Sequence, residues 1–152
     1  MSVKPVPDGY TTLTNFFSVQ GADKFCAFLE QAFGASHVHP PMKRPDGAFS
    51  HAEMQVGSSR VMIGEARDAS EHLPTMLYMY VEDCDAVFKR AAAAGGETIM
   101  PPTDMFYGDR HGGIKDAWGN QWWIATHIED VEPAEMERRM AEEMAKRAAE
   151  GK

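Results

Sequence analysis

Residues 101–127 read PPTDMFYGDRHGGIKDAWGNQWWIATH, and this stretch decides the fold. It places the turn Trp118-Gly119-Asn120 between two runs of strand-forming residues. Gly113–Ala117 and Gln121–Thr126 are therefore expected to be neighbouring strands joined by that turn. We expect the whole stretch to form one wall of a cup for a small molecule.

The residues before this turn predict a strand, a helix and further strands. Thr75–Val81 has the aromatic content of a strand, and Asp83–Ala94 has helical spacing with glycines at its end. Glu97–Met100 is expected to be a strand that stops at Pro101-Pro102. Met105–Tyr107 is expected to be a short strand piece, with Gly108–Gly112 as a turn.

The first half of the chain follows the same order of elements. Tyr10–Val19 favours a strand, and Ala22–Phe33 favours a helix that ends at Gly34. Ser50–Val56 alternates apolar and polar residues, and it is expected to form a hairpin with Arg60–Gly64. The connecting segments are a short strand at Ser36–His39, a loop at Pro40–Gly47 and a polar linker at Arg67–Leu73.

The two halves match at a constant offset of 62 residues, which predicts a duplicated unit. The matches fall at a strand end, a first helical turn, a helix end, a loop and a turn: Val19 and Val81, Asp23 and Asp85, Gly34 and Gly96, Pro40 and Pro102, Gly57 and Gly119. We expect one α+β domain over residues 1–152, made of two tandem βαβββ modules at about 8–66 and 73–128. A C-terminal helix is expected at 132–150.

Composition excludes several classes of partner. The chain has 15 Lys and Arg against 23 Asp and Glu, a formal charge of −8, which opposes binding to nucleic acid or to an anionic membrane surface. No apolar run approaches the roughly 20 residues of a membrane span. The N-terminal residues lack the apolar core of a signal peptide. Cys26 and Cys84 show no metal spacing, so reduced thiols and a cytoplasmic location are expected.

Strand alternation divides the expected sheet residues into two faces. One set is almost wholly apolar and is expected to face the helices: Leu13, Phe17, Val19, Ala52, Met54, Leu77, Met79, Val81, Trp122 and Ile124. The other set mixes aromatic and hydrogen-bonding groups, as a ligand pocket does: Thr12, Thr14, Phe16, His51, Glu53, Gln55, Tyr78, Tyr80, Gln121 and Trp123. The alternative is that this second face packs the two sheets together or against a dimer partner.

Three segments carry a resemblance to a known family. HAEMQVGSSRVMIGE, LYMYVEDCDAVFKRA and MPPTDMFYGDRHGGIKDAWGNQWWIATH make the chain similar to the vicinal oxygen chelate superfamily, which includes glyoxalases, bleomycin-resistance proteins and dioxygenases. More narrowly, the chain resembles the PhnB-like branch. The resemblance covers about residues 8–130 and implies two βαβββ modules that form U-shaped cups, commonly in a homodimer.

The resemblance also implies positions for a metal site, which this chain fills with unsuitable residues. Metal-dependent members take His, Glu or Gln ligands from the first and last strands of both modules. Those positions are here Thr14, Val61, Met76 and Trp123, or, after a slip of one residue, Leu13, Met62, Leu77 and Trp122. None suits Zn²⁺, Ni²⁺ or Fe²⁺, so the family's divalent metal is expected to be absent, and no other cofactor is expected.

His51 and Glu53 are the candidate catalytic residues. They lie two apart on one strand, so both side chains share a face, where they suit an acid/base pair. They also suit two ligands of a different metal site, completed by His111 or His127. The alternative is ordinary hydrogen bonding at the pocket wall.

Residues near the glycine turn and the second strand are candidate ligand contacts. Arg110 suits bidentate binding of a carboxylate or phosphate, while Asp109 is expected to brace the loop. Phe106 and Tyr107 are expected to close over the cup. Trp123 offers a surface for stacking an aromatic or cationic guest, or else it fills the cup. Tyr78 and Tyr80 likewise either contact a guest or fill the cup.

Met136, Met140 and Met144 form a stripe at a spacing of four on the C-terminal helix. This stripe is expected to dock on its own domain or on a twin subunit.

Three functions remain open from the sequence. The first is a metal-free protein that binds a small planar or aromatic compound in its cup. The second is a glyoxalase-like isomerase or lyase that uses His51 and Glu53, with a non-standard metal or none. The third is a dimeric structural or regulatory module whose cup is filled by its own side chains.

Overall fold

The computed structural model describes residues 2–151. The first module comprises β1 (Asn15–Val19), α1 (Ala22–Phe33), β2 (Ser36–His37), β3 (Met42–Lys43), β4 (Phe49–Val56) and β5 (Ser59–Glu65). A short 3₁₀ helix, η1 (Ala69–Glu71), lies in the linker. The second module comprises β6 (Met76–Tyr80), α2 (Cys84–Ala93), β7 (Glu97–Asp104), β8 (Asp109–Lys115) and β9 (Gln121–His127). The chain continues into α3 (Pro133–Ala149).

Each module forms one sheet with the same connections. Sheet A has the order β1-β5-β4-β2, with β3 also paired to β4, and sheet B has the order β6-β9-β8-β7. The first strand of each module runs parallel to its last strand, and the remaining pairs are antiparallel. The α+β fold with two βαβββ modules is thereby confirmed.

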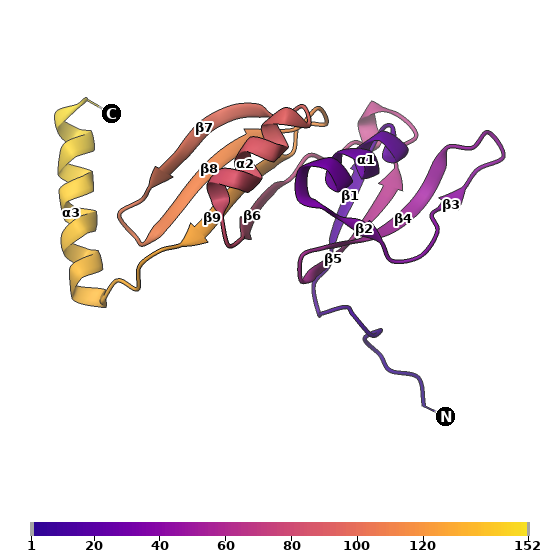
Figure 1. Cartoon of the computed structure of the whole chain (residues 1–152), viewed down its shortest axis with the longest axis horizontal. Coiled ribbons are helices and arrows are strands. Elements are labelled where there is room, and N and C mark those ends of the chain that lie inside the picture. Colours follow the sequence, from indigo (N-terminus) through magenta and orange to yellow (C-terminus); the bar gives the residue numbers. More distant parts are fainter. Residues whose placement is uncertain (1, 152) are drawn as a thin grey trace.

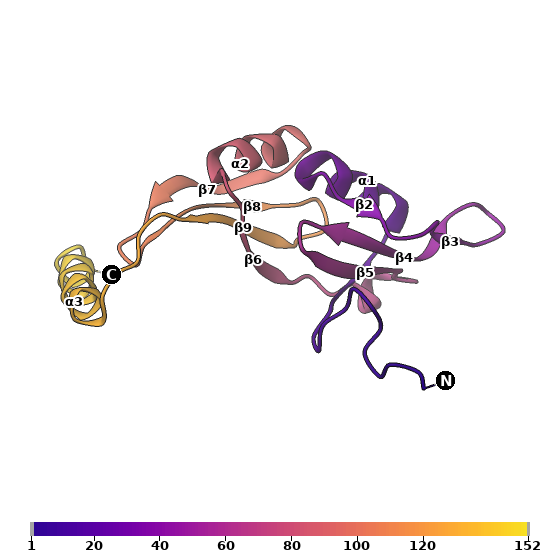
Figure 2. The same ribbon diagram turned by 60° about the horizontal axis from the view of Figure 1, so that its bottom comes forward.

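Both module helices cover one side of the sheets. Figures 1 and 2 show α1 over sheet A and α2 over sheet B, next to each other, whereas α3 stands apart at the far end of sheet B. The opposite side carries no helix among the described residues, and we call it the open face of each sheet. The N-terminal segment runs below the open face of sheet A in Figure 2.

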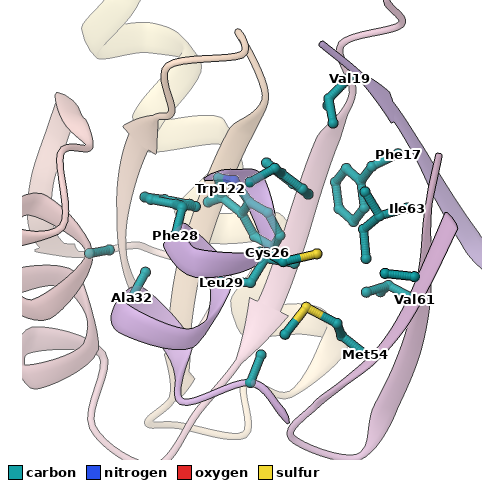
Figure 3. Packing of buried hydrophobic residues seen from close by; sticks show 14 of the residues in the cluster. Phe17, Val19, Cys26, Phe28, Leu29, Ala32, Met54, Val61, Ile63 and Trp122 are labelled. Atoms are coloured by element: carbon teal, nitrogen blue, oxygen red, sulfur yellow. The ribbon is translucent and has the colours of Figure 1, made fainter. Parts of the chain in front are cut away.

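The core lies between α1 and sheet A and continues into sheet B. Leu29 of α1 is fully buried, as are Phe17 and Ile63 of the sheet (Figure 3). Phe25 of α1 is also fully buried, with its ring centroid 4.8 Å from that of Phe17. The indole of Trp122 stacks on Phe17 with ring centroids 5.6 Å apart, so the second module contributes to the core of the first.

The two cysteines are free and buried in this structure. Burial, with the nearby charges of Glu30 and Asp23, raises the pKa of the Cys26 thiol to about 12. An un-ionised thiol is a poor nucleophile, so Cys26 acts as a packing residue.

The Trp118-Gly119-Asn120 turn is organised by one buried carboxylate. Asp116 accepts hydrogen bonds from the backbone N–H of Trp118 at 2.9 Å and from the backbone N–H of Asn120 at 3.0 Å. The same carboxylate accepts from Trp122 Nε1 at 2.8 Å and from Asn120 Nδ2 at 3.0 Å. The segment Asp116–Trp122 therefore holds the β8–β9 hairpin together and lies away from the open face.

Trp118 ties this turn to the first module. Its indole N–H donates to the carbonyl of Gln20 at 2.8 Å, and its ring meets the ring of Phe25 edge-on at 5.0 Å between centroids. On the other side of the same interface, Arg90 of α2 donates to the carbonyl of Gln31 at the end of α1 at 2.6 Å.

Several expected boundaries were wrong. The first strand begins at Asn15 rather than Tyr10, and Leu13, expected to face the helix, is 87% exposed. β7 continues through Pro101-Pro102 to Asp104 because it is an edge strand with irregular pairing, where prolines need no partner for an N–H.

The glycine-rich segment also differs from expectation. Met105–Tyr107 lies in the tight turn between β7 and β8, whereas Asp109–Gly112, expected as a turn, is the first half of strand β8. Smaller differences are the short strand Met42–Lys43 within the expected loop at 40–47 and the 3₁₀ helix within the linker.

The constant offset of 62 does not hold through the last strand. Phe17 pairs with Ile63 on the helix side, and Met79 pairs with Ile124 on the same side of sheet B. The offset is thus 62 between the first strands but 61 between the last strands. Val61 is buried on the helix side, and the counterpart of Trp123 on the open face is Met62.

Candidate functional site

The open face of sheet B carries a cluster of aromatic and ionisable side chains. Strand alternation and register bring together Tyr78 and Tyr80 of β6, Asp109 and His111 of β8, and Trp123 and His127 of β9. Ala125 lies between Tyr80 and His111 in the register, and its small side chain lets the tyrosines reach across β9.

Asp109 is the centre of this cluster and is only 4% exposed. Its Oδ2 accepts hydrogen bonds from the hydroxyls of Tyr78 and Tyr80, both at 2.9 Å. Its Oδ1 lies 2.9 Å from His127 Nδ1. Burial alone raises the pKa of Asp109, but the hydrogen bonds from His127, Tyr78 and Tyr80 outweigh burial and hold it below its usual value. Asp109 is therefore an ionised, fully paired carboxylate.

Hydrogen bonds to Asp109 shift the pKa values of the groups around it. Hydrogen bonds to Asp109 and Asp130 raise the pKa of His127, whose Nε2 lies 2.7 Å from Asp130. Burial and hydrogen bonds to Tyr107 and Asp109 raise the pKa of Tyr78, and the bond to Asp109 raises that of Tyr80. The phenols consequently stay protonated and donate to the carboxylate.

His111 is 7% exposed and neutral. Burial lowers its pKa, and the nearby Asp109 charge offsets only part of that effect. Its Nδ1 lies 3.0 Å from the Tyr78 hydroxyl and 3.2 Å from the Tyr107 hydroxyl. These contacts fix the imidazole ring at the centre of the open face.

Trp123 lies flat on the sheet because its neighbour on β8 is glycine. A Cβ on Gly113 would come within 2.9 Å of three carbons of the indole ring. The indole N–H donates to Gln121 Oε1 at 3.2 Å, and the ring centroid lies 5.1 Å from that of His111. One face of the indole therefore rests on the strand, and the other faces away from it.

The β7–β8 turn borders this cluster. Phe106 and Tyr107 pack edge to face, with ring centroids 5.3 Å apart, and Tyr107 reaches His111. The Phe106 carbonyl accepts from Arg139 of α3 at 3.0 Å, which links the turn to the C-terminal helix. The two aromatic residues thus stand at the rim of the site.

Arg110 does not reach the open face. It alternates with Asp109 and His111 along β8 and so lies on the helix side of sheet B. Its guanidinium pairs with Asp85 of α2 at 3.1 Å and with Asp104 of β7 at 2.9 Å. The structure therefore gives no support to a ligand clamp at Arg110, whose charge is already paired.

Glu53 is the centre of a second, separate cluster on the open face of sheet A. His39 Nε2 lies 2.8 Å from its carboxylate and His51 Nε2 lies 3.6 Å away. The hydroxyl of Tyr10, from the N-terminal segment, also donates to Glu53. The expected pair of His51 and Glu53 is brought together, but the two residues are covered in part by residues before β1.

The remaining candidates on sheet A are spread around this cluster. Phe16 lies over Gly64 as Trp123 lies over Gly113, and it remains 52% exposed. Gln55 accepts from Arg60 at 3.0 Å. Thr14 lies before β1 and lines a hollow of about 220 Å³ together with Tyr10.

The residues of the open faces do not fit the metal site that the resemblance implied. Register places Phe16, Met62, Tyr78 and Trp123 at the open-face positions of the first and last strands. Within residues 2–151, no group of three or more His, Cys, Asp or Glu side chains is arranged to hold a metal ion. Phenol, indole, phenyl and thioether groups are poor ligands for Zn²⁺, Ni²⁺ or Fe²⁺.

A groove of about 420 Å³ lies between the two modules. It runs between the β4–β5 turn and the edge strand β6, and its walls are mainly apolar. Tyr78 and Tyr80 line it, so the groove adjoins the open face of sheet B.

Comparison with known proteins gives the family. A model of the glyoxalase/bleomycin resistance protein/dioxygenase superfamily matches residues 12–124. The chain belongs to this superfamily. The matched range contains both modules as far as β9, and α3 lies outside it.

Relatives in sequence come from mycobacteria. An uncharacterized protein of Mycobacterium bovis is 26% identical over 108 residues, which cover 64% of this chain and 71% of that protein. An uncharacterized protein of Mycobacterium tuberculosis strain H37Rv is also 26% identical over 108 residues, 64% of each chain.

Solved structures share the fold at low sequence identity. TioX from Micromonospora sp. ML1 has a TM-score of 0.67 at 22% identity, over 78% of this chain and 99% of TioX. A glyoxalase-related enzyme from Fulvimarina pelagi has a TM-score of 0.60 at 16% identity, over 76% of this chain and 87% of the enzyme. The fosfomycin resistance protein FosX from Mesorhizobium loti has a TM-score of 0.57 at 17% identity, over 76% and 91% of the two chains.

Sequence reasoning missed the network around Asp109. Asp109 and His111 were assigned to a turn, and in a turn a spacing of two residues does not indicate that two side chains share a face. On a strand, the same spacing places both side chains on one face. Extending the strand back to Asp109 would have supplied the missing signal.

Among residues 2–151, no helix combines the length and apolar character needed to cross a membrane.

Proposed function

We propose that this protein binds a small planar or aromatic compound on the open face of sheet B, without a metal ion. The observation that carries the proposal is the indole of Trp123, held flat over Gly113 beside His111. A flat, partly exposed indole face is a stacking surface, and such surfaces bind planar guests. Tyr78, Tyr80 and Gln121 border it, and Phe106 and Tyr107 form its rim.

The superfamily membership agrees with this proposal without supplying the ligand. Bleomycin resistance, in the superfamily's description, is consistent with binding and sequestration. We also propose the PhnB-like branch for this chain, on the DMFYGDR and WGNQWW segments, and a location in the cytoplasm, which suits two free thiols.

Tryptophan fluorescence tests the binding function. Titration with quinoline, chromone and acridine is expected to give saturable quenching with at least one of them. The effect is expected to vanish in Trp123→Ala and to persist in Trp118→Phe, since Trp118 lies at the module interface away from the open face. Equal responses of wild type and Trp123→Ala to every compound would contradict the proposal.

A second function is favoured by the cluster around Glu53. A carboxylate in contact with His39, His51 and Tyr10 has the components of an acid/base site for a glyoxalase-like isomerase or lyase. Metal analysis of the purified protein discriminates between the two functions. Stoichiometric metal that is lost in His51→Ala would favour this second function over metal-free binding.

We further propose that the protein is a homodimer. Tyr80 on the open face is 63% exposed, and Met140 and Met144 of α3 are 47% and 64% exposed. No residue of α3 is buried in the single chain. Isolated amphipathic helices are marginal in water, so the methionine stripe of α3 suits contact with a second copy.

A further inference from the structure

His111 has one ring nitrogen that makes no hydrogen bond within the described residues 2–151. Nδ1 lies 3.0 Å from the Tyr78 hydroxyl and 3.2 Å from the Tyr107 hydroxyl, whereas Nε2 has no partner in that range. In the same range, the buried side-chain nitrogen or oxygen atoms that lack a partner are Asn15 Nδ2 and His37 Nδ1. Nε2 of His111 is not one of these buried atoms, so it is open to a molecule that lies on the sheet.

The hydrogen bonds around Nδ1 determine where the imidazole carries its proton. Asp109 is ionised and accepts the hydroxyl proton of Tyr78 at 2.9 Å, so the Tyr78 oxygen offers only lone pairs to His111. The contact of 3.0 Å between that oxygen and Nδ1 therefore requires a proton on Nδ1. The Tyr107 oxygen is a second acceptor for the same N–H.

Nε2 is consequently a hydrogen-bond acceptor. Burial lowers the pKa of His111, which keeps the ring neutral, and a neutral imidazole has one N–H and one nitrogen with a free lone pair. With the proton on Nδ1, the lone pair is on Nε2. The chain of hydrogen bonds from His111 through Tyr78 to Asp109 thus fixes the chemical character of the exposed atom.

The lone pair lies beside the stacking surface. The ring centroids of His111 and Trp123 are 5.1 Å apart, so a planar guest stacked on the indole has an edge next to the imidazole and shields it from water. A guest with no donor at that edge would leave Nε2 without a partner, and an unpaired acceptor away from water is costly. A guest with an N–H or O–H group there would satisfy it.

We infer that the ligand of this site is a planar aromatic compound with an N–H or O–H group at one edge, and that this group donates a hydrogen bond to His111 Nε2. The inference rests on the proposed binding function and specifies its ligand class. Trp123 supplies the area of contact, and His111 sets the orientation of the guest. Asp109 and Tyr78 are positioning residues that hold the imidazole in the acceptor tautomer.

The tautomer of His111 is measured first, without a ligand. Nitrogen-15 chemical shifts and long-range couplings of the histidine rings at pH 7 are expected to show His111 neutral and protonated on Nδ1. Tyr78→Phe removes the oxygen that Asp109 orients, so part of the population is expected to move to the other tautomer. A wild-type ring that is charged, or protonated on Nε2 alone, would overturn the inference.

Two probes of equal size then test the ligand class. Indole carries an N–H group where benzofuran carries an oxygen atom, and binding of each is followed by the Trp123 side-chain N–H signal in nitrogen-15-labelled protein. Indole is expected to bind about tenfold more tightly, the value of one hydrogen bond. The Nε2 shift of His111 is expected to move at saturation with indole and to stay in place with benzofuran.

His111→Phe keeps a flat ring at this position and removes the acceptor. In this variant the advantage of indole over benzofuran is expected to disappear, while both probes still bind. An advantage that persists would refute the role of His111. If the variant does not fold, the Nε2 shift in the wild-type protein decides, since a shift that does not respond to indole excludes the hydrogen bond.

The outcomes separate this inference from the function on which it rests. Equal affinities of indole and benzofuran in the wild type would refute the donor contact and leave planar binding intact. Failure of both probes to bind would overturn the inference together with the proposed function.

Discussion

At the scale of single residues, the site depends on a glycine. Gly113 has no positive φ, so the backbone there accepts any residue, and the need for glycine comes from the indole above it. A methyl group at this position would have to occupy the space of three ring carbons of Trp123. Gly64 has the same relation to Phe16 on sheet A, which offers a matched control.

Gly113→Ala is expected to lift Trp123 from the sheet and to weaken binding of planar compounds at least tenfold. The cost in stability is expected to be about 1–3 kcal/mol, the usual range for overpacking. Gly64→Ala is expected to cost a similar amount but to leave that binding unchanged, because Phe16 lies on the other module. Binding titrations and urea unfolding of both variants measure these effects, and unaltered binding in Gly113→Ala would contradict the role given to Trp123.

The pH dependence of the cluster follows from His127. Its pKa is raised above 6.5 by Asp109 and Asp130, so its ion pairs add stability that is fully present below the unfolded-state pKa. That stability is lost as the pH rises through the higher pKa of the folded state. The difference in unfolding free energy between wild type and His127→Gln is therefore expected to shrink as the pH rises from about 6 to about 9.

Titration of His127 by NMR checks the same assignment directly. The pKa in wild type is expected to exceed 6.5 and to fall in both Asp109→Asn and Asp130→Asn, since each variant removes one of its two charged partners. A pKa that is unchanged in both variants would show that the two carboxylates do not control this histidine.

At the scale of elements, the most distinctive sequence motif is structural. The Asp116–Trp122 segment folds into a turn in which one carboxylate satisfies the donors of Trp118, Asn120 and Trp122. Removing a buried acceptor leaves these donors unpaired, which is costly.

Asp116→Ala is consequently expected to destabilise the protein by about 3 kcal/mol or more, without a direct contact to the open face. Asp46→Ala in the exposed turn before β4 is the control, because a surface substitution of this kind is expected to cost about 1 kcal/mol or less. Chemical denaturation of both variants gives the comparison. Similar losses in the two would remove the special role assigned to Asp116.

The sequence predicted elements where hydrophobic periodicity is strong and failed where turn residues lie within strands. Ala22–Phe33 was predicted with the observed bounds, because its apolar spacing and Gly34 both mark it clearly. The glycines of β8 suggested a turn, yet Gly112 is required by Phe88 and Gly113 by Trp123, which lie against them. Side-chain packing from α2 and from β9 determined these glycines, and a single sequence does not display it.

The same limit explains the site. Trp123, Tyr78 and Tyr80 were predicted from alternation along strands, and the structure places them on one open face. Asp109 and His111 join them only through the register of β8 with β9, which depends on where β8 begins. Arg110 was proposed as a ligand contact because its residue type suits anions, but its strand position directs it to Asp85 and Asp104.

At the scale of the whole molecule, α3 is the part that a single chain does not explain. Its link to the body runs through Arg139, which donates to the Phe106 carbonyl at 3.0 Å and pairs with Glu129 at 2.7 Å. Met140 and Met144 of the methionine stripe are exposed, and Figure 1 shows the helix standing clear of the sheets.

If the stripe contacts a second copy, light scattering during gel filtration is expected to give twice the chain mass of 16.9 kDa. Introducing glutamate at both Met140 and Met144 places two charges in that contact and is expected to give the monomer mass. Glutamate at both Ala145 and Ala149 adds the same charges on the opposite side of the helix and is expected to leave the dimer intact.

A wild-type monomer at micromolar concentration would refute the dimer. A dimer that tolerates charges at Met140 and Met144 would place the contact elsewhere, and the exposed Tyr80 on the open face of sheet B would then be the position to vary.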